Sequence, residues 1–414
     1  MSNLLESAFS KTTITPQPAQ GHELAGYITR RGKSQGVHDD IELRALLIED
    51  DLAVLLVNLD LLGVDTHIKE TIQRVAEKTI GNVNVIVTAT HTHSAPATLF
   101  TNFLLTFGDN AFRKDYFDYF VEQTEKTFSN IANNLETAET YISKTKIRDI
   151  ATDRNDPRNP IDNEALLLTF ASKGEAKGFL VNYAVHPTVL GPDNLLITKD
   201  LIEYILKGLY SVLKTNIGLF LNGAAGNIST RFTRRAQTFS EAERIGNEFS
   251  RQVLASKFRL HNVENLRIVS KEITVSFKEY TEEEIRKLSM PTWKNGTRRS
   301  ESLREGIEAL NKLYPIISKK RYTAKTEIIG LNLGDLKMVF VPFELHSDIS
   351  LSLKKLVEPQ YLALIGYTNE YFGYLLMKEA EPGYENIMQF VDEKTRQQVF
   401  SAICNVLDID PCSL

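Results

Sequence analysis

Apolar residues along the chain fall into runs and spacings that predict strands alternating with helices. Residues 53–61 (AVLLVNLDL) are almost continuously apolar, which is typical of a strand covered on both faces. Residues 66–80 place apolar side chains at helical spacing, and Gly81 is a typical helix stop. Residues 84–90 (NVIVTAT) predict the next strand. Two buried strands joined by a helix predict a parallel pair with a right-handed crossover.

Two hairpins are predicted farther along. Residues 164–171 and 179–185 are apolar runs on either side of a turn, and residues 327–333 and 337–341 flank a Gly334–Asp335 turn. We also expect helices at about 199–213 and 344–356, with strands at 217–221 and 361–366.

Taken together, these elements predict an α/β fold with a mixed β-sheet core, surrounding helices and β-hairpins, in a single large domain over residues 1–414. The charged segment 280–321 has helical character, and we interpret it as a helical insertion or lid.

Composition narrows the class of protein. The 414 residues are 42% hydrophobic, and 48 Lys and Arg against 53 Asp and Glu give a net charge of −5, which argues against a nucleic-acid partner. No apolar run reaches the roughly 20 residues of a transmembrane helix. The N-terminus lacks the features of a secretory signal, so we expect a cytoplasmic location. Cys404 and Cys412 alone exclude a disulfide framework or a cysteine-rich zinc cage.

Two of the eight histidines lie in the sequence ATHTHSAP, residues 89–96, where a predicted buried strand ends. In an extended backbone, residues i and i+2 point to the same side, so His91 and His93 are expected to face one pocket. The carboxyl edge of such strands is where α/β proteins bind their ligands. The alternative is a pair of polar histidines that cap a strand end.

Two further candidate ligands follow predicted strands. His186 lies in NYAVHP at the end of an apolar run, where a lone histidine is more typical of a structural role. Glu344 follows VFVPF at the start of a predicted helix, where an acid is stabilised by the helix dipole. Tyr371, Tyr374 and Tyr384 lie in loops, where tyrosines commonly pack.

Because these candidates all fall where strands end, they favour a shared site. Two histidines, one carboxylate and an open position suit catalytic zinc better than a closed structural site. They also suit zinc better than calcium or magnesium. The residues alone therefore favour a metallohydrolase.

Short blocks of sequence recur in the order found in one family. They are GVHDD (36–40), NLDLLG (58–63), ATHTHSAP (89–96), NYAVHPT (182–188), NGAAGNIS (222–229), VPFE (341–344) and YTNEYFGY (367–374). At these residues the chain resembles the neutral/alkaline (non-lysosomal) ceramidase family, in its N-terminal zinc amidohydrolase domain.

The resemblance implies one catalytic zinc ion, with water completing its coordination. Its implied protein ligands are His91, His186, Glu344 and Tyr374. His93 is implied to support the ligands or to orient the substrate.

The resemblance also implies residues that handle the substrate. Arg154 matches a family arginine that holds the polar head of the substrate or the developing oxyanion, although the family has Ser-Pro after it and this chain reaches Pro157 by a different spacing. Tyr384 matches a tyrosine that contacts the amide oxygen. Ser229 ends a small-residue loop that lines the pocket.

The implied activity is zinc-dependent hydrolysis of an N-acyl amide, small or lipid-like, which places the chain in lipid metabolism and yields a carboxylic acid and a free amine. Secreted ceramidases carry a signal sequence and a C-terminal immunoglobulin-like domain, and we expect neither here. We therefore expect a smaller or more polar amide than ceramide. The alternatives are a zinc hydrolase of an ester or small N-acyl amino acid, and a non-catalytic relative that binds a lipid or sugar.

Overall fold

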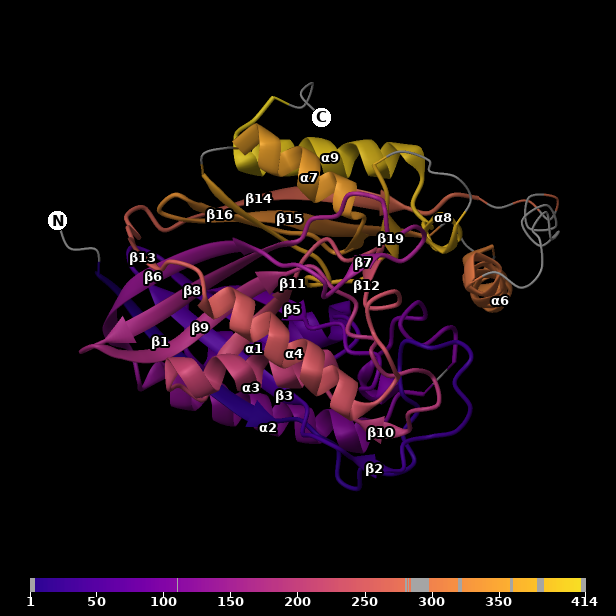
Figure 1. Ribbon diagram of the computed structural model, residues 1–414, viewed down its shortest axis with the longest axis horizontal. Coiled ribbons are helices and arrows are strands. Elements are labelled where there is room, and N and C mark those ends of the chain that lie inside the picture. Colours follow the sequence, from indigo (N-terminus) through magenta and orange to yellow (C-terminus); the bar gives the residue numbers. More distant parts are fainter. Residues whose placement is uncertain are drawn as a thin grey trace.

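The computed structural model stacks four layers in the order helices, sheet, sheet, helices (Figure 1). It describes residues 4–109, 111–279, 281, 283, 298–318, 322–357, 360–377 and 383–410. The side chains of residues 298–302 are not described.

The larger sheet is mixed, with strand order β11-β9-β8-β6-β1-β3-β4-β5 and β13 paired to β6. Two neighbouring pairs, β4 with β5 and β9 with β11, are parallel. The strands are β1 (Leu4–Thr13), β3 (Glu42–Glu49), β4 (Ala53–Leu59), β5 (Asn84–Ala89), β6 (Glu136–Lys146), β8 (Glu164–Ser172), β9 (Glu175–Tyr183), β11 (Gly218–Asn222) and β13 (Arg259–His261).

A second sheet packs face to face on the first. Its order is β14 (Arg267–Ser276), β15 (Thr323–Leu333), β16 (Leu336–Phe340) and β18 (Tyr361–Ile365), and β16 and β18 are parallel. One buried apolar cluster joins the two sheets, with Leu56 from the first and Leu331 and Phe340 from the second. This cluster is the inner core of the sandwich.

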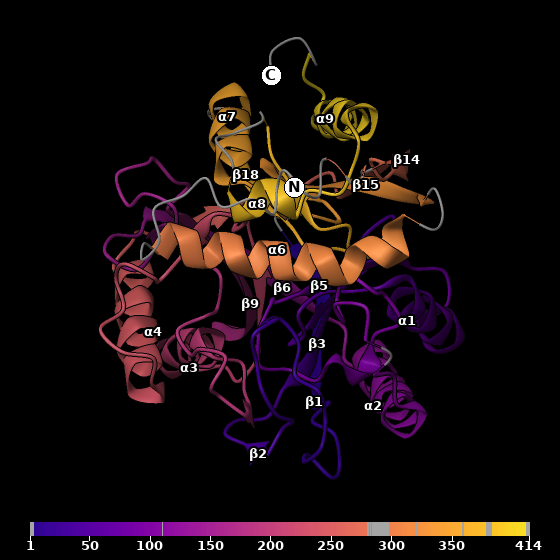
Figure 2. The ribbon, with the colours of Figure 1, turned by 90° about the vertical axis from the view of Figure 1, so that its right-hand side faces the viewer.

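Helices cover the two outer faces. The larger sheet is covered by α1 (Thr66–Thr79), α2 (Lys114–Ala132), α3 (Leu201–Leu213) and α4 (Phe239–Leu254). The smaller sheet is covered by α7 (Ser347–Val357) and α9 (Glu393–Leu407). Figure 2 shows α6 (Arg298–Ile317) crossing the end of the molecule, close to the short helix α8 (Tyr384–Ile387). Within the described part of the chain, the helices are too short or too polar to cross a membrane.

The predicted α/β fold with a mixed sheet is confirmed. The parallel β4–α1–β5 unit forms as expected, and both predicted hairpins appear, as β8–β9 and β15–β16. Helix α6 accounts for the helical part of the predicted insertion, whereas residues 280, 282, 284–297 and 319–321 lie outside the described residues. Cys404 is a buried free thiol, and Cys412 also lies outside them.

The predicted helix over 344–356 is wrong at its start. Helix α7 begins at Ser347, because Glu344–Leu345 form the short strand β17, paired in parallel with β19 (Tyr374–Leu375). The backbone N–H of Glu344 donates to the carbonyl of Gly373. Glu344 is therefore held by a strand pairing rather than by a helix terminus.

Candidate metal centre

Four predicted ligands converge where two strands of the larger sheet end beside the short β17–β19 pair. His91 follows β5, His186 follows β9, Glu344 lies in β17 and Tyr374 in β19. Oε2 of Glu344 is 3.2 Å from Nε2 of His186 and 3.4 Å from Nε2 of His91. The hydroxyl of Tyr374 is 3.4 Å from the same nitrogen of His186. All four side chains are buried, so the sequence-predicted set forms one cluster.

Backbone carbonyls orient both ligand histidines. Nδ1 of His91 lies 2.6 Å from the carbonyl oxygen of Leu62, and Nδ1 of His186 lies 2.7 Å from that of Ala225. A carbonyl only accepts hydrogen bonds, so each Nδ1 carries the proton and each Nε2 presents a lone pair to the centre. Burial also holds the pKa of His186 at about 4, which keeps the imidazole neutral near neutral pH.

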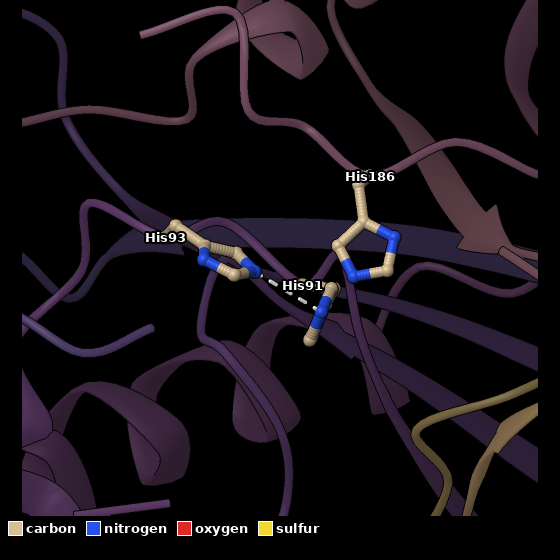
Figure 3. Close-up of side chains that lie close together, drawn as sticks. All are labelled: His91, His93 and His186. Atoms are coloured by element: carbon tan, nitrogen blue, oxygen red, sulfur yellow. Dashed lines mark hydrogen bonds between the residues drawn. The ribbon is translucent and has the colours of Figure 1, made fainter. Parts of the chain in front are cut away.

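The expectation of an extended backbone at His91 and His93 is wrong at His91. His91 has φ +67°, in the left-handed region. Its ring stacks on Tyr367, with centroids 4.1 Å apart. His91 and His93 nevertheless face the same point, with their Nε2 atoms 3.2 Å apart (Figure 3).

Glu344 provides a test of whether a cation fits. Its Oε1 accepts a hydrogen bond from the hydroxyl of Tyr371, whereas its Oε2 is buried without a hydrogen-bond partner. That oxygen faces the two Nε2 lone pairs described above. Three acceptor atoms turned toward one another in the interior repel unless a cation lies among them. The donor set therefore fits a divalent metal ion.

His93 offers a third imidazole nitrogen. One ring nitrogen from each of His91, His93 and His186 lies within 4.8 Å of the others, so these three could hold a metal ion (Figure 3). Nδ1 of His93 is buried and has no partner. Gly26 packs against this ring so closely that a Cβ there would lie 2.5 Å from its Cγ. Gly26 also has φ +95°, so only glycine suits this position.

Arg154 connects the centre to its surroundings. Its Nε donates to Oε1 of Glu385 at 2.7 Å, and its Nη2 donates to the hydroxyl of Tyr374 at 3.1 Å. The guanidinium also lies over the ring of Tyr384, 5.1 Å from its centroid. Burial raises the pKa of Tyr374 well above its usual value, although Arg154 opposes that shift. Burial therefore favours the neutral phenol of Tyr374 over the phenolate.

A cavity of about 90 Å³ opens beside these residues. Six of the eight predicted site residues line it: His93, Arg154, His186, Ser229, Tyr374 and Tyr384. His91 and Glu344 lie behind this wall, at the metal centre. The lining residues that sequence reasoning missed are Gly26, Tyr27, Thr188, Arg231, Arg234 and Glu305. Arg231 and Arg234 lie two and five residues after the NGAAGNIS block, and basic residues so close to a predicted pocket loop are the signal that the sequence offers.

Comparison with known proteins finds relatives of this chain. Residues 9–206 match the family model described as neutral/alkaline non-lysosomal ceramidase, N-terminal. The neutral ceramidases of Drosophila melanogaster and Drosophila pseudoobscura pseudoobscura are each 24% identical over 247 residues, which is 53% of this chain and 35% of the relative. The match thus spans about a third of the length of these curated relatives.

Two solved structures share the fold. "Crystal Structure Analysis of neutral ceramidase from Pseudomonas aeruginosa" has a TM-score of 0.73 at 17% identity, covering 98% of this chain and 75% of that one. "Ceramidase complexed with C2" has a TM-score of 0.72 at 16% identity, covering 98% of this chain and 76% of that one. The fold of nearly the whole chain is therefore that of these ceramidase structures.

Proposed function

Because this chain belongs to the neutral/alkaline non-lysosomal ceramidase family, we propose that it is a zinc-dependent amidohydrolase that cleaves an N-acyl amide to a carboxylic acid and a free amine. The family match includes His91, His93 and His186, and the fold adds Glu344 and Tyr374 to the same cluster. Of these residues, the resemblance assigns His91, His186, Glu344 and Tyr374 to metal binding, and His93 to supporting the ligands or orienting the substrate.

One observation carries the proposal. Oε2 of Glu344 is buried without a hydrogen-bond partner and faces the lone pairs of two histidines whose tautomers are fixed by carbonyls. Imidazole nitrogens with carboxylate and phenol oxygens favour zinc over magnesium or calcium. His91, His186, Glu344 and Tyr374 would hold the ion. When bound, zinc supplies a Lewis acid and lowers the pKa of a coordinated water to about 7.

The surrounding residues can handle the substrate. Arg154 and Tyr384 line the cavity next to Tyr374, where a guanidinium and a phenol can donate hydrogen bonds to the oxygen of the amide as charge develops on it. His93 also lines the cavity, and burial together with the neighbouring histidines holds its pKa well below the usual value. A neutral imidazole there can accept a proton from the attacking water and return it to the leaving nitrogen.

A hydrolysis assay with metal removal tests this function. We expect the purified protein to release amine from a short N-acyl amide, to lose that activity with a chelator, and to regain it with zinc. A matched ester with the same acyl group distinguishes amide from ester hydrolysis. Activity that is unchanged in chelated, metal-free protein would contradict the proposal.

A further inference from the structure

The cavity beside the candidate metal centre is small and lined by three arginines, which favours a negatively charged substrate. We propose that the substrate is a small amide bearing an anionic group, and that Arg231 and Arg234 bind that group. The inference rests on the proposed amidohydrolase function and names its substrate class.

Every side chain that lines the cavity carries a polar group. Its side chains come from three arginines, three tyrosines, two histidines and one each of threonine, serine and glutamate, with Gly26 beside them. Among the described residues, no aliphatic side chain lines this cavity. Its volume of about 90 Å³ is well below the roughly 300–1,000 Å³ of pockets that enclose drug-sized ligands. A long acyl chain gains its binding energy by burying apolar surface, and a cavity this small, with tyrosine rings as its apolar walls, cannot enclose such a chain.

The charge of the lining is positive. Arg154, Arg231 and Arg234 line the cavity, and Glu305 is the one acidic lining residue in the described part of the chain. Arg154 also has Glu385 as an ion-pair partner outside the lining. Burial, with Arg154 and Arg234 close by, lowers the pKa of Arg231, and Glu305 and Glu385 only partly offset this effect. A bound anion would relieve the repulsion among these guanidinium groups.

Both arginines are tied to the metal centre through the backbone. The strand β12 (Ile228–Ser229) bonds to the backbone N–H of His186, and Oγ of Ser229 accepts from the N–H of Arg231 at 3.3 Å. Nη1 of Arg234 donates to the carbonyl of Thr188, two residues after His186. Both arginines line the same small cavity as His186 and Tyr374, so we expect the anion that they bind to lie only a few bonds from the scissile amide.

Guanidinium groups bind carboxylates and phosphates in the same forked geometry. The favoured substrates are therefore an N-acyl amino acid, with its carboxylate next to the amide nitrogen, or an amide of a small phosphorylated amine. Glu305 projects from α6, where Gly306 approaches Tyr384 so closely that a Cβ would lie 3.2 Å from its ring. Glu305 offsets part of the positive charge around Arg231, and a substrate anion would act in the same way.

A charge-matched substrate panel tests the proposal. The zinc-loaded protein is assayed with one short acyl group on glycine, on phosphoethanolamine and on neutral ethanolamine, and with a short-chain ceramide. We expect kcat/KM to be at least about tenfold higher for an anionic amide than for the neutral ones. The preference between glycine and phosphoethanolamine distinguishes a carboxylate site from a phosphate site.

Single-residue variants test whether Arg231 causes the preference for anionic amides. Arg231→Gln should lower kcat/KM for the anionic amide on the order of 10- to 100-fold and lower it much less for the neutral amide. Arg231→Lys should retain part of the preference because it keeps the charge. Glu305→Gln should lower KM for the anionic amide. Arg235→Gln is the matched control, since Arg235 is exposed and does not line the cavity.

Binding measured by calorimetry separates this inference from the proposed function. We expect the N-acylglycine to bind to wild type and to bind much more weakly to Arg231→Gln, even in chelated protein that does not turn over. Hydrolysis of neutral and anionic amides at equal rates, unaffected by Arg231→Gln, would overturn the inference and leave the amidohydrolase standing. Charge-dependent binding without hydrolysis of any amide would overturn the amidohydrolase instead.

Discussion

Oε2 of Glu344 lies 3.2 Å from Nε2 of His186, although His186 follows a strand of the large sheet and Glu344 belongs to the separate β17–β19 pair. The large sheet supplies the histidines, and β17 and β19 supply the carboxylate and the phenol. The predicted ligand set of His91, His186, Glu344 and Tyr374 is therefore complete only where the two parts meet. Metal binding is therefore expected to depend on how the two sheets pack, and to stabilise that packing.

Replacing His93 should separate proton transfer from metal binding. If His93 handles the proton, His93→Ala should keep the metal and lose roughly 10²- to 10⁴-fold in kcat. Metal content and turnover measured on the same sample check this. His67→Ala is the control, because this histidine packs on Phe117 in the helical layer. Loss of the metal in His93→Ala would instead make His93 a ligand, consistent with its nitrogen lying within 4.8 Å of those of the other two histidines.

Tyr371→Phe should weaken metal binding without removing a ligand. The Tyr371 hydroxyl donates to Oε1 of Glu344 and so fixes the carboxylate. Loss of such a supporting hydrogen bond typically lowers metal affinity by about 10- to 100-fold. Competition with a chromogenic chelator measures the change. An unaltered affinity would show that the backbone pairing of β17 alone positions Glu344.

Arg44→Met should strongly destabilise the fold while leaving the metal site chemically intact. Arg44 and Asp60 are fully buried and form two hydrogen bonds of 2.9 and 2.8 Å. Removing one partner leaves a buried charge unpaired, which costs about 3–5 kcal/mol in the free energy of unfolding. Urea denaturation measures it. Because the double variant Arg44→Met/Asp60→Leu removes both charges, it should recover much of the loss, and its failure to do so would contradict this explanation.

Acid should weaken the fold partly through Glu42. Burial would raise the pKa of this carboxyl, but Arg44, Lys199 and Lys11 outweigh burial and hold the pKa at about 2, below its usual 4.5. A lowered folded pKa means that ionised Glu42 stabilises the fold above pH 4.5 and that this contribution is lost as pH falls toward 2. The difference in melting temperature between wild type and Glu42→Gln should therefore shrink across this window. A constant difference would contradict the assignment.

Local elements could be predicted from the sequence because their signals are local. The apolar runs at β4 and β5 and the turn at Gly334–Asp335 give the correct strands and pairings. Burial of the strands on both faces was correctly predicted for β4. Its cause, however, is a second sheet on one side and helices on the other. The stacking of two sheets depends on contacts between distant segments, which a periodicity does not encode.

The family resemblance predicts the candidate site residue by residue. What this prediction misses has physical causes. Tyr371 was interpreted as a packing residue, because nothing in a single sequence shows that its hydroxyl reaches Glu344. Glu344 was placed on a helix, since the β17–β19 pairing is too short to produce an alternating pattern. Arg231 and Glu305 meet at the cavity only through tertiary packing.

Metal analysis of the purified protein tests the central claim most directly. By mass spectrometry of wild type and of the His186→Ala and Glu344→Gln variants, we expect about one zinc ion per wild-type chain and almost none in either variant, with amide hydrolysis lost in parallel. Wild-type protein that hydrolyses the amide while holding no metal, or a His186→Ala variant with full zinc and full turnover, would contradict the account.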